Sequence, residues 1–64
     1  FKKLSTREIE VLRYFSEGRK NKEVAKILGL DEKTISTYKL RLLQKLSVTN
    51  LLDLINKAKQ LEII

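Results

Sequence analysis

Residues 21–41, NKEVAKILGLDEKTISTYKLR, contain two helical patterns separated by a short break, and this break constrains the fold more than any other feature. Apolar residues recur at helical spacing up to Leu28, the pattern stops at the letters GLD, and it resumes at Ile35. A glycine after such a run is typical of a helix end, and an aspartate is typical of a helix start. The segment therefore predicts two helices that cross at a tight turn, with Leu30 packed into the core.

Start and stop signals of this kind occur along the whole chain and predict four helices with short turns. The first helix has the most complete start, because Ser5 can cap it and the Glu8 side chain can reach back to the Ser5 amide. We expect this helix to run from about Thr6 to Glu17, just before Gly18. The other three are expected to begin at the caps Asn21, Asp31 and either Thr49 or Asn50.

Each predicted helix has one apolar face, so we expect an all-α fold in which residues 1–64 form a single domain. At about 100° per residue, the third helix has Ile35, Tyr38, Leu42 and Leu46 on its inner face. The inner faces expected for the other helices comprise Ile9, Val11, Leu12 and Phe15, then Val24, Ala25, Ile27 and Leu28, and finally Leu51, Leu54, Ile55, Ala58 and Leu61.

The residue types that are absent exclude several function classes. The chain has no cysteine and no histidine, so it has no disulfide, no thiol or imidazole for catalysis and no usual zinc ligand set. A chain of 64 residues also has too small a core to enclose a substrate pocket. We expect no enzymatic activity, no metal, no cofactor and no membrane partner, and a reducing, cytoplasmic setting fits.

The charge is strongly positive and concentrated on the predicted third helix. There are 14 lysines and arginines against 8 acidic residues, which gives a net charge of +6. Charged residues between positions 33 and 52 are all positive, whereas those between 53 and 64 cancel. Such a distribution favours an acidic partner such as nucleic acid.

The outer face of the third helix suits the major groove of DNA. It is expected to carry Lys33, Ser36, Thr37, Leu40 and Gln44, with Thr34, Lys39, Arg41 and Lys45 at its borders. Small polar side chains can approach base edges there, while bordering cations meet phosphates. We predict Ser36, Thr37 and Leu40 as base readers, with Lys33 also able to reach a base. The predicted phosphate contacts are Asn21, Lys22, Thr34, Lys39, Arg41 and Lys45.

With these elements placed, the chain resembles the LuxR/FixJ (GerE) family of helix-turn-helix domains, the DNA-binding ends of many bacterial response regulators and quorum sensors. The resemblance rests on LSTREIEVL followed by Gly18, on NKEVAKILGL, on KTISTYK and on KLSVTN, in that order and at the family's spacing. The chain departs from the family at Tyr38, where histidine is frequent, at Leu51, where arginine is frequent, and at Glu62, where glycine is common.

The resemblance implies a four-helix LuxR-type domain, with the helix-turn-helix motif at about residues 21–40. It implies sequence-specific binding of double-stranded DNA as the C-terminal effector domain of a bacterial transcription regulator, controlled by an N-terminal sensing or receiver domain. It also implies a homodimer on DNA through the fourth helix, and it leaves RNA polymerase open as a partner. For the dimer interface we predict Leu52, Ile55, Asn56 and Lys59.

Two other functions are compatible with the sequence. The chain could be the promoter-reading domain of a sigma factor, which uses a similar helix-turn-helix, although the LSTREIEVL start favours the regulator group. It could also be a protein-interaction module, with outward Leu40 and Leu52 carrying the contact. Membrane-surface binding is a weaker alternative, because the basic helix buries its apolar stripe in the core.

Overall fold

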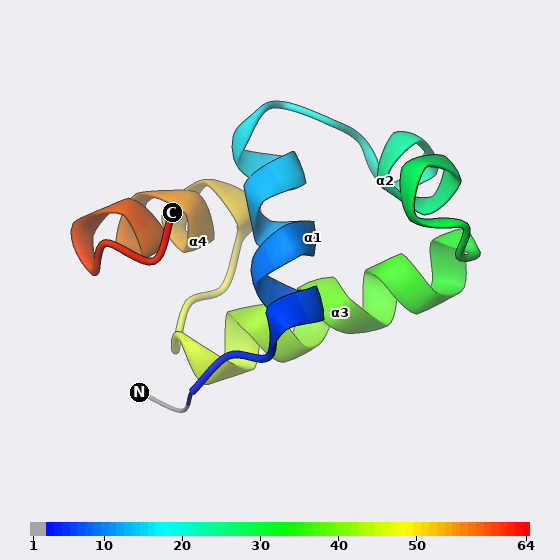
Figure 1. Ribbon diagram of the computed structural model, residues 1–64. Helices are drawn as coiled ribbons and strands as arrows, with labels where there is room; N and C mark the ends of the chain where they lie inside the picture. The colour runs from blue at the N-terminus through cyan, green and yellow to red at the C-terminus, as the bar shows by residue number, and fades with distance from the viewer. Residues whose placement is uncertain (1–2) are drawn as a thin grey trace.

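In the computed structural model, which describes residues 3–64, the long helix α3 forms a base on which the other helices are assembled (Figure 1). Helix α1 crosses α3 near its middle, with α2 to one side of α1 and α4 to the other. Every pair of helices except α2 and α4 is in contact within the described part of the chain. The helices are α1 (Thr6–Ser16), α2 (Asn21–Leu28), α3 (Glu32–Lys45) and α4 (Leu51–Gln60). Residues 3–64 include no strand and no helix that is long and apolar enough to cross a membrane.

Three predicted helix starts are confirmed by hydrogen bonds. The Glu8 amide donates to Ser5 Oγ at 3.2 Å, and the Ser5 amide donates to Glu8 Oε1 at 2.8 Å, which completes a capping box. Asp31 accepts from the Thr34 amide at 2.7 Å, and Asn50 caps α4 in the same way.

The predicted start of the second helix is wrong by one residue. Lys20 is the N-cap of α2, and Asn21 is the first helical residue. The reason is that the Val24 amide donates to the Lys20 carbonyl at 3.0 Å, which starts the helix one residue earlier, and the Lys20 amide donates to Glu23 Oε1 at 3.1 Å. The Asn21 side chain is thereby left free for another partner.

All four helices end in the same local structure. One residue in the left-handed region follows each helix, and the next amide donates to a carbonyl five residues earlier, which is the Schellman motif. The left-handed residues are Gly18 (φ 87°), Gly29 (φ 68°), Ser47 (φ 55°) and Glu62 (φ 59°). The motif turns the chain back sharply, and after α2, α3 and α4 the following side chain (Leu30, Val48 or Ile63) packs against the core.

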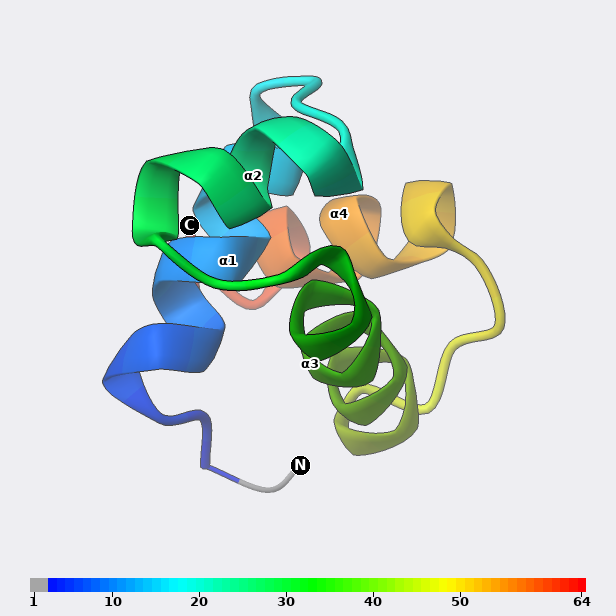
Figure 2. The same ribbon diagram turned by 90° about the vertical axis from the view of Figure 1, so that its right-hand side faces the viewer.

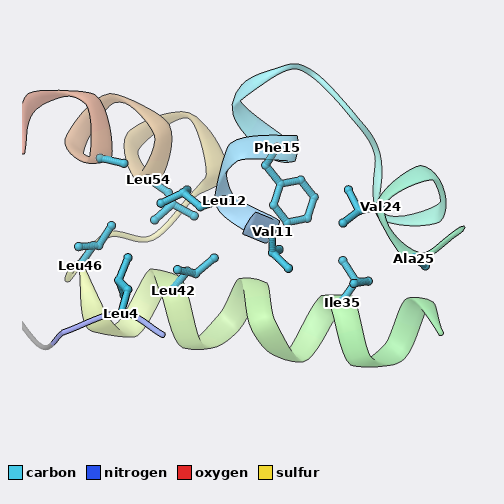
Figure 3. Close-up of a cluster of buried hydrophobic side chains, with 11 residues drawn as sticks. Leu4, Val11, Leu12, Phe15, Val24, Ala25, Ile35, Leu42, Leu46 and Leu54 are labelled. Atoms are coloured by element: carbon cyan, nitrogen blue, oxygen red, sulfur yellow. The ribbon is translucent and has the colours of Figure 1, made fainter. Parts of the chain in front are cut away.

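The core lies where α1, α2 and α4 meet α3, and it confirms most of the predicted inner faces (Figure 3). Ile9, Leu28, Leu30, Tyr38 and Leu51 are half-buried against it. The buried apolar residues are Leu4, Val11, Leu12, Phe15, Val24, Ala25, Ile35, Leu42, Leu46, Leu54 and Ala58.

Two residues predicted to be in the core are exposed instead. Ile27 is 45% exposed, because α2 packs through Val24 and Ala25 and Ile27 falls to one side of that face. Leu61 is 40% exposed, because α4 ends at Gln60 and the turn after it carries Ile63 back to the core.

Candidate nucleic-acid interface

One side of α3 is left uncovered by the other helices, as the view along this helix shows (Figure 2). Ile35, Leu42 and Leu46 hold the opposite side in the core, and this fixes the rotation of the helix about its axis. Lys33, Thr37, Leu40, Arg41 and Gln44 are exposed on the free side, and Leu40 is 60% exposed. Thr34, Ser36 and Lys39 are half-buried at its borders. The structure thus brings the predicted base readers together on one accessible surface.

A hydrogen bond ties the start of α2 to this surface. Asn21 Nδ2 donates to Ser36 Oγ at 2.9 Å, and both side chains are half-buried. Asn21 is therefore placed at the edge of the α3 surface, while the next residue, Lys22, is exposed beside it. This contact was not predicted, because residues 15 positions apart give no local sequence signal for a bond between two helices.

The Thr37 hydroxyl is also engaged. Its Oγ1 donates to the backbone carbonyl of Lys33 at 3.1 Å, one turn earlier in α3. Bonds of this kind are common for threonine within helices, and they hold the side chain in one rotamer. Thr37 consequently presents its methyl group and the two free lone pairs of Oγ1 in a fixed orientation.

A shallow hollow borders the α3 surface on the side of α4. Ser36, Lys39 and Leu40 line it from α3, and Thr49 and Asn50 line it from the segment that leads into α4. Thr49 and Asn50 are not among the predicted site residues, because their place before α4 indicates only a capping role. The hollow offers polar side chains and one ammonium group next to the predicted base readers.

The positive charge on this surface is not neutralised within the domain. Lys33, Lys39 and Arg41 form no ion pair with any acid among residues 3–64. The acids nearest in sequence are at the start of α3, where Asp31 caps the helix, and hydrogen bonds from Thr34 lower the pKa of that carboxyl. The free charges of the lysines and the arginine therefore remain available to an acidic partner.

Lys45 differs from the prediction. Its Nζ lies 2.8 Å from Glu8 Oε1, so its charge is committed to an ion pair instead of facing out from α3. No local pattern indicates this pair, because the two residues are 37 positions apart. We accordingly leave Lys45 out of the candidate phosphate contacts.

The predicted dimer residues lie on one stripe of α4. Leu52 is 68% exposed, Asn56 and Lys59 are exposed, and Ile55 is half-buried. Positions 52, 55, 56 and 59 follow the spacing of a single helix face, and this face points away from the core residues Leu54 and Ala58.

Comparison with known proteins relates the chain to bacterial transcription regulators. A sequence profile described as bacterial regulatory proteins, luxR family, matches residues 2–58. The chain is 51% identical over 57 residues to BvgA of Bordetella pertussis, a positive transcription regulator of virulence factors, covering 89% of this chain and 27% of BvgA. It is 42% identical over 57 residues to EvgA of Escherichia coli K12, a DNA-binding transcriptional activator, covering 89% of this chain and 28% of EvgA.

A solved structure agrees with these relatives. The crystal structure of ChrA, the response regulator of a heme-sensing two-component system, matches the fold with a TM-score of 0.95 at 34% identity. The match covers 100% of this chain and 32% of ChrA. The predicted all-α, four-helix fold is confirmed, and the chain spans about a third or less of the length of these relatives.

Proposed function

Since the chain belongs to the luxR family of bacterial regulatory proteins, we propose that it binds double-stranded DNA sequence-specifically as the effector domain of a two-component response regulator. In this proposal residues 1–64 act as one DNA-binding unit whose helix-turn-helix, at about residues 21–40, lays α3 in the major groove. The observation that carries the proposal is the uncovered side of α3, where small polar side chains lie among cations that have no acidic partner.

The residues of this surface divide into base readers and phosphate binders. Ser36, Thr37 and Leu40 project where base edges would lie, and the largely exposed Leu40 is suited to contact with a thymine methyl group. Lys33, in the first turn of α3, can reach a base or a phosphate. Phosphate contacts are assigned to Lys22, Thr34, Lys39 and Arg41, and to the start of α2 at Asn21, where backbone amides and the helix dipole favour an anion.

A dimer would give the domain its useful affinity and set the spacing between half-sites. One domain of this size makes few base contacts, whereas two domains related by symmetry place two α3 helices in successive major grooves. The exposed stripe of α4, formed by Leu52, Ile55, Asn56 and Lys59, is the surface proposed for this contact. In the intact protein an N-terminal sensing or receiver domain would control access to these surfaces, and RNA polymerase would be a partner at the promoter.

Two substitutions on α3 test this proposal, because the two classes of contact respond differently. Lys39→Ala should weaken binding about equally on all DNA sequences and lower the slope of log affinity against log salt by roughly one unit. Thr37→Ala should cost on the order of 1 to 3 kcal/mol, but at one base position only. Both are measured by titrating the domain with labelled duplexes at two salt concentrations, with Lys26→Ala, an exposed cation near the far end of α2, as the control.

Three outcomes would contradict the proposal. If the affinity for DNA changed neither with salt concentration nor with DNA sequence, the result would favour a protein-interaction module that uses Leu40 and Leu52. A strict requirement for core RNA polymerase would favour the promoter-reading domain of a sigma factor. If Lys39→Ala and Thr37→Ala both left DNA binding unchanged, the assigned surface would be wrong.

A further inference from the structure

The hydroxyls of Ser36 and Thr37 are adjacent on α3, but they are engaged in opposite ways. Ser36 Oγ accepts a hydrogen bond from Asn21 Nδ2 at 2.9 Å. Thr37 Oγ1 donates its own hydrogen to the Lys33 carbonyl at 3.1 Å. One neighbour therefore uses a lone pair inside the domain, and the other uses its hydrogen.

These internal bonds determine what each hydroxyl can offer to a ligand. A hydroxyl has one hydrogen and two acceptor lone pairs. The amide nitrogen of Asn21 cannot accept, so the Ser36 hydrogen points elsewhere, and no acceptor is bonded to it within residues 3–64. The Thr37 hydrogen is already used, so Thr37 can only accept from a partner.

The start of α2 holds the backbone of Asn21 in a fixed position. The Lys20 amide is bonded to Glu23 in the first turn, and Val24 and Ala25 are buried in the core in the next turn. The Asn21–Ser36 bond is itself partly buried, which reduces competition from water. The orientation of the Ser36 hydroxyl is thus set by a separate helix, not by α3 alone.

We propose that Asn21 is a positioning residue that makes Ser36 a hydrogen-bond donor toward DNA, while Thr37 acts beside it as an acceptor. This inference rests on the proposed DNA-binding function. In the major groove the acceptors are purine N7, guanine O6 and thymine O4, and the donors are the amino groups of cytosine and adenine. Ser36 accordingly selects an acceptor edge and disfavours cytosine, whereas Thr37 selects an amino group or packs its methyl against a thymine.

The decisive variant is Asn21→Asp, which has nearly the same shape but, when ionised, only acceptor oxygens. Ser36 must then donate its hydrogen to Asp, and only lone pairs remain for the base. The base preference at the Ser36 position is measured by selecting bound duplexes from a random pool. The original chain should prefer an acceptor base over cytosine by on the order of tenfold, and Asn21→Asp should shift the preference toward cytosine or adenine.

Three further variants separate orientation from other effects. Asn21→Ala should reduce the preference to within about twofold without reversing it, because the hydroxyl becomes free to rotate. Lys22→Ala, next to Asn21 in the chain, should lower affinity without changing the preference. In a Ser36→Ala background, Asn21→Asp should no longer alter the preference, because the residue that it orients is missing.

The outcomes distinguish this inference from the proposed function. If the original chain selected sequences but Asn21→Asp and Asn21→Ala kept its preference, the inference would be overturned and the proposed function would stand. A shift that persisted in the Ser36→Ala background would also overturn it, because Asn21 would then contact the base directly. If the original chain selected no sequence at all, both proposals would be overturned. Should Asn21→Asp fail to fold, as judged by circular dichroism, Asn21→Ala with and without Ser36→Ala provides the same test.

Discussion

Glu8 is only 3% exposed, and a single oxygen, Oε1, accepts from both the Ser5 amide and the Lys45 ammonium group at 2.8 Å. Burial alone would raise the pKa of this carboxyl, but the hydrogen bonds from Lys45 and Ser5 outweigh it and lower the pKa below its ordinary value of 4.5. One side chain thereby joins the cap of α1 to the end of α3. Because a buried charge without a partner is costly, the buried Glu8 carboxylate depends on Lys45.

A first stability prediction follows from the sign of this shift. Since the folded-state pKa of Glu8 lies below the unfolded value, ionised Glu8 stabilises the fold above about pH 4.5, and that stabilisation is lost as the pH falls through the lower folded value. Glu8→Gln should therefore unfold at lower urea concentration at pH 7, and the difference from the original chain should shrink as the pH approaches 3. A difference that stayed constant with pH would show that Glu8 acts only through its shape.

At the scale of elements, the sequence predicts local features well and contacts between helices poorly. Ser5 and Asp31 are predictable as caps, and Asn50 as one of two candidates with Thr49, because each of these caps bonds an amide three residues later. The Asn21–Ser36 and Glu8–Lys45 contacts join different helices, and their geometry depends on how the helices cross, which no local pattern contains. The α3 surface was predictable for the opposite reason, because burial of Ile35 and Leu42 fixes which side chains face out.

The helix ends give a second stability prediction. Glu62 occupies the left-handed region after α4 with φ 59°, a conformation that costs a residue with a side chain about 1 kcal/mol and glycine much less. Its carboxylate also lies at the negative end of the α4 dipole. Glu62→Gly should therefore raise the free energy of unfolding by roughly 0.5 to 1 kcal/mol.

Glu62→Ala is the matched control, because it removes the charge but keeps the strained backbone. Glu62→Ala should raise the free energy of unfolding by less than Glu62→Gly does in the same urea or thermal unfolding experiment. Equal stabilisation by the two substitutions would mean that charge, and not backbone conformation, limits the stability of this turn.

At the scale of the whole molecule, the two proposed surfaces lie on different helices, the DNA surface on α3 and the dimer contact on α4. α3 offers polar and cationic groups suited to DNA, whereas the stripe of α4 is centred on Leu52, which is 68% exposed and contributes nothing to the core. A leucine so exposed is tolerated in a folded domain, so replacing it should leave the fold intact. The two surfaces can consequently be tested separately by choosing DNA with one half-site or two.

Leu52→Glu should lower affinity for duplexes that carry two half-sites and leave affinity for a single half-site unchanged. Across a symmetric contact the two introduced glutamates would repel each other, and the contact would lose the apolar area that the two leucines bury. Gln60→Glu is the control, since it adds the same charge to an exposed position at one side of the stripe. The comparison is made by titrating both variants with each duplex at fixed salt. Equal loss on one and two half-sites would indicate that Leu52→Glu damages the fold, and no loss on either would place the dimer contact elsewhere. Only a loss confined to paired half-sites, and absent in Gln60→Glu, assigns the contact between paired domains to the exposed stripe of α4.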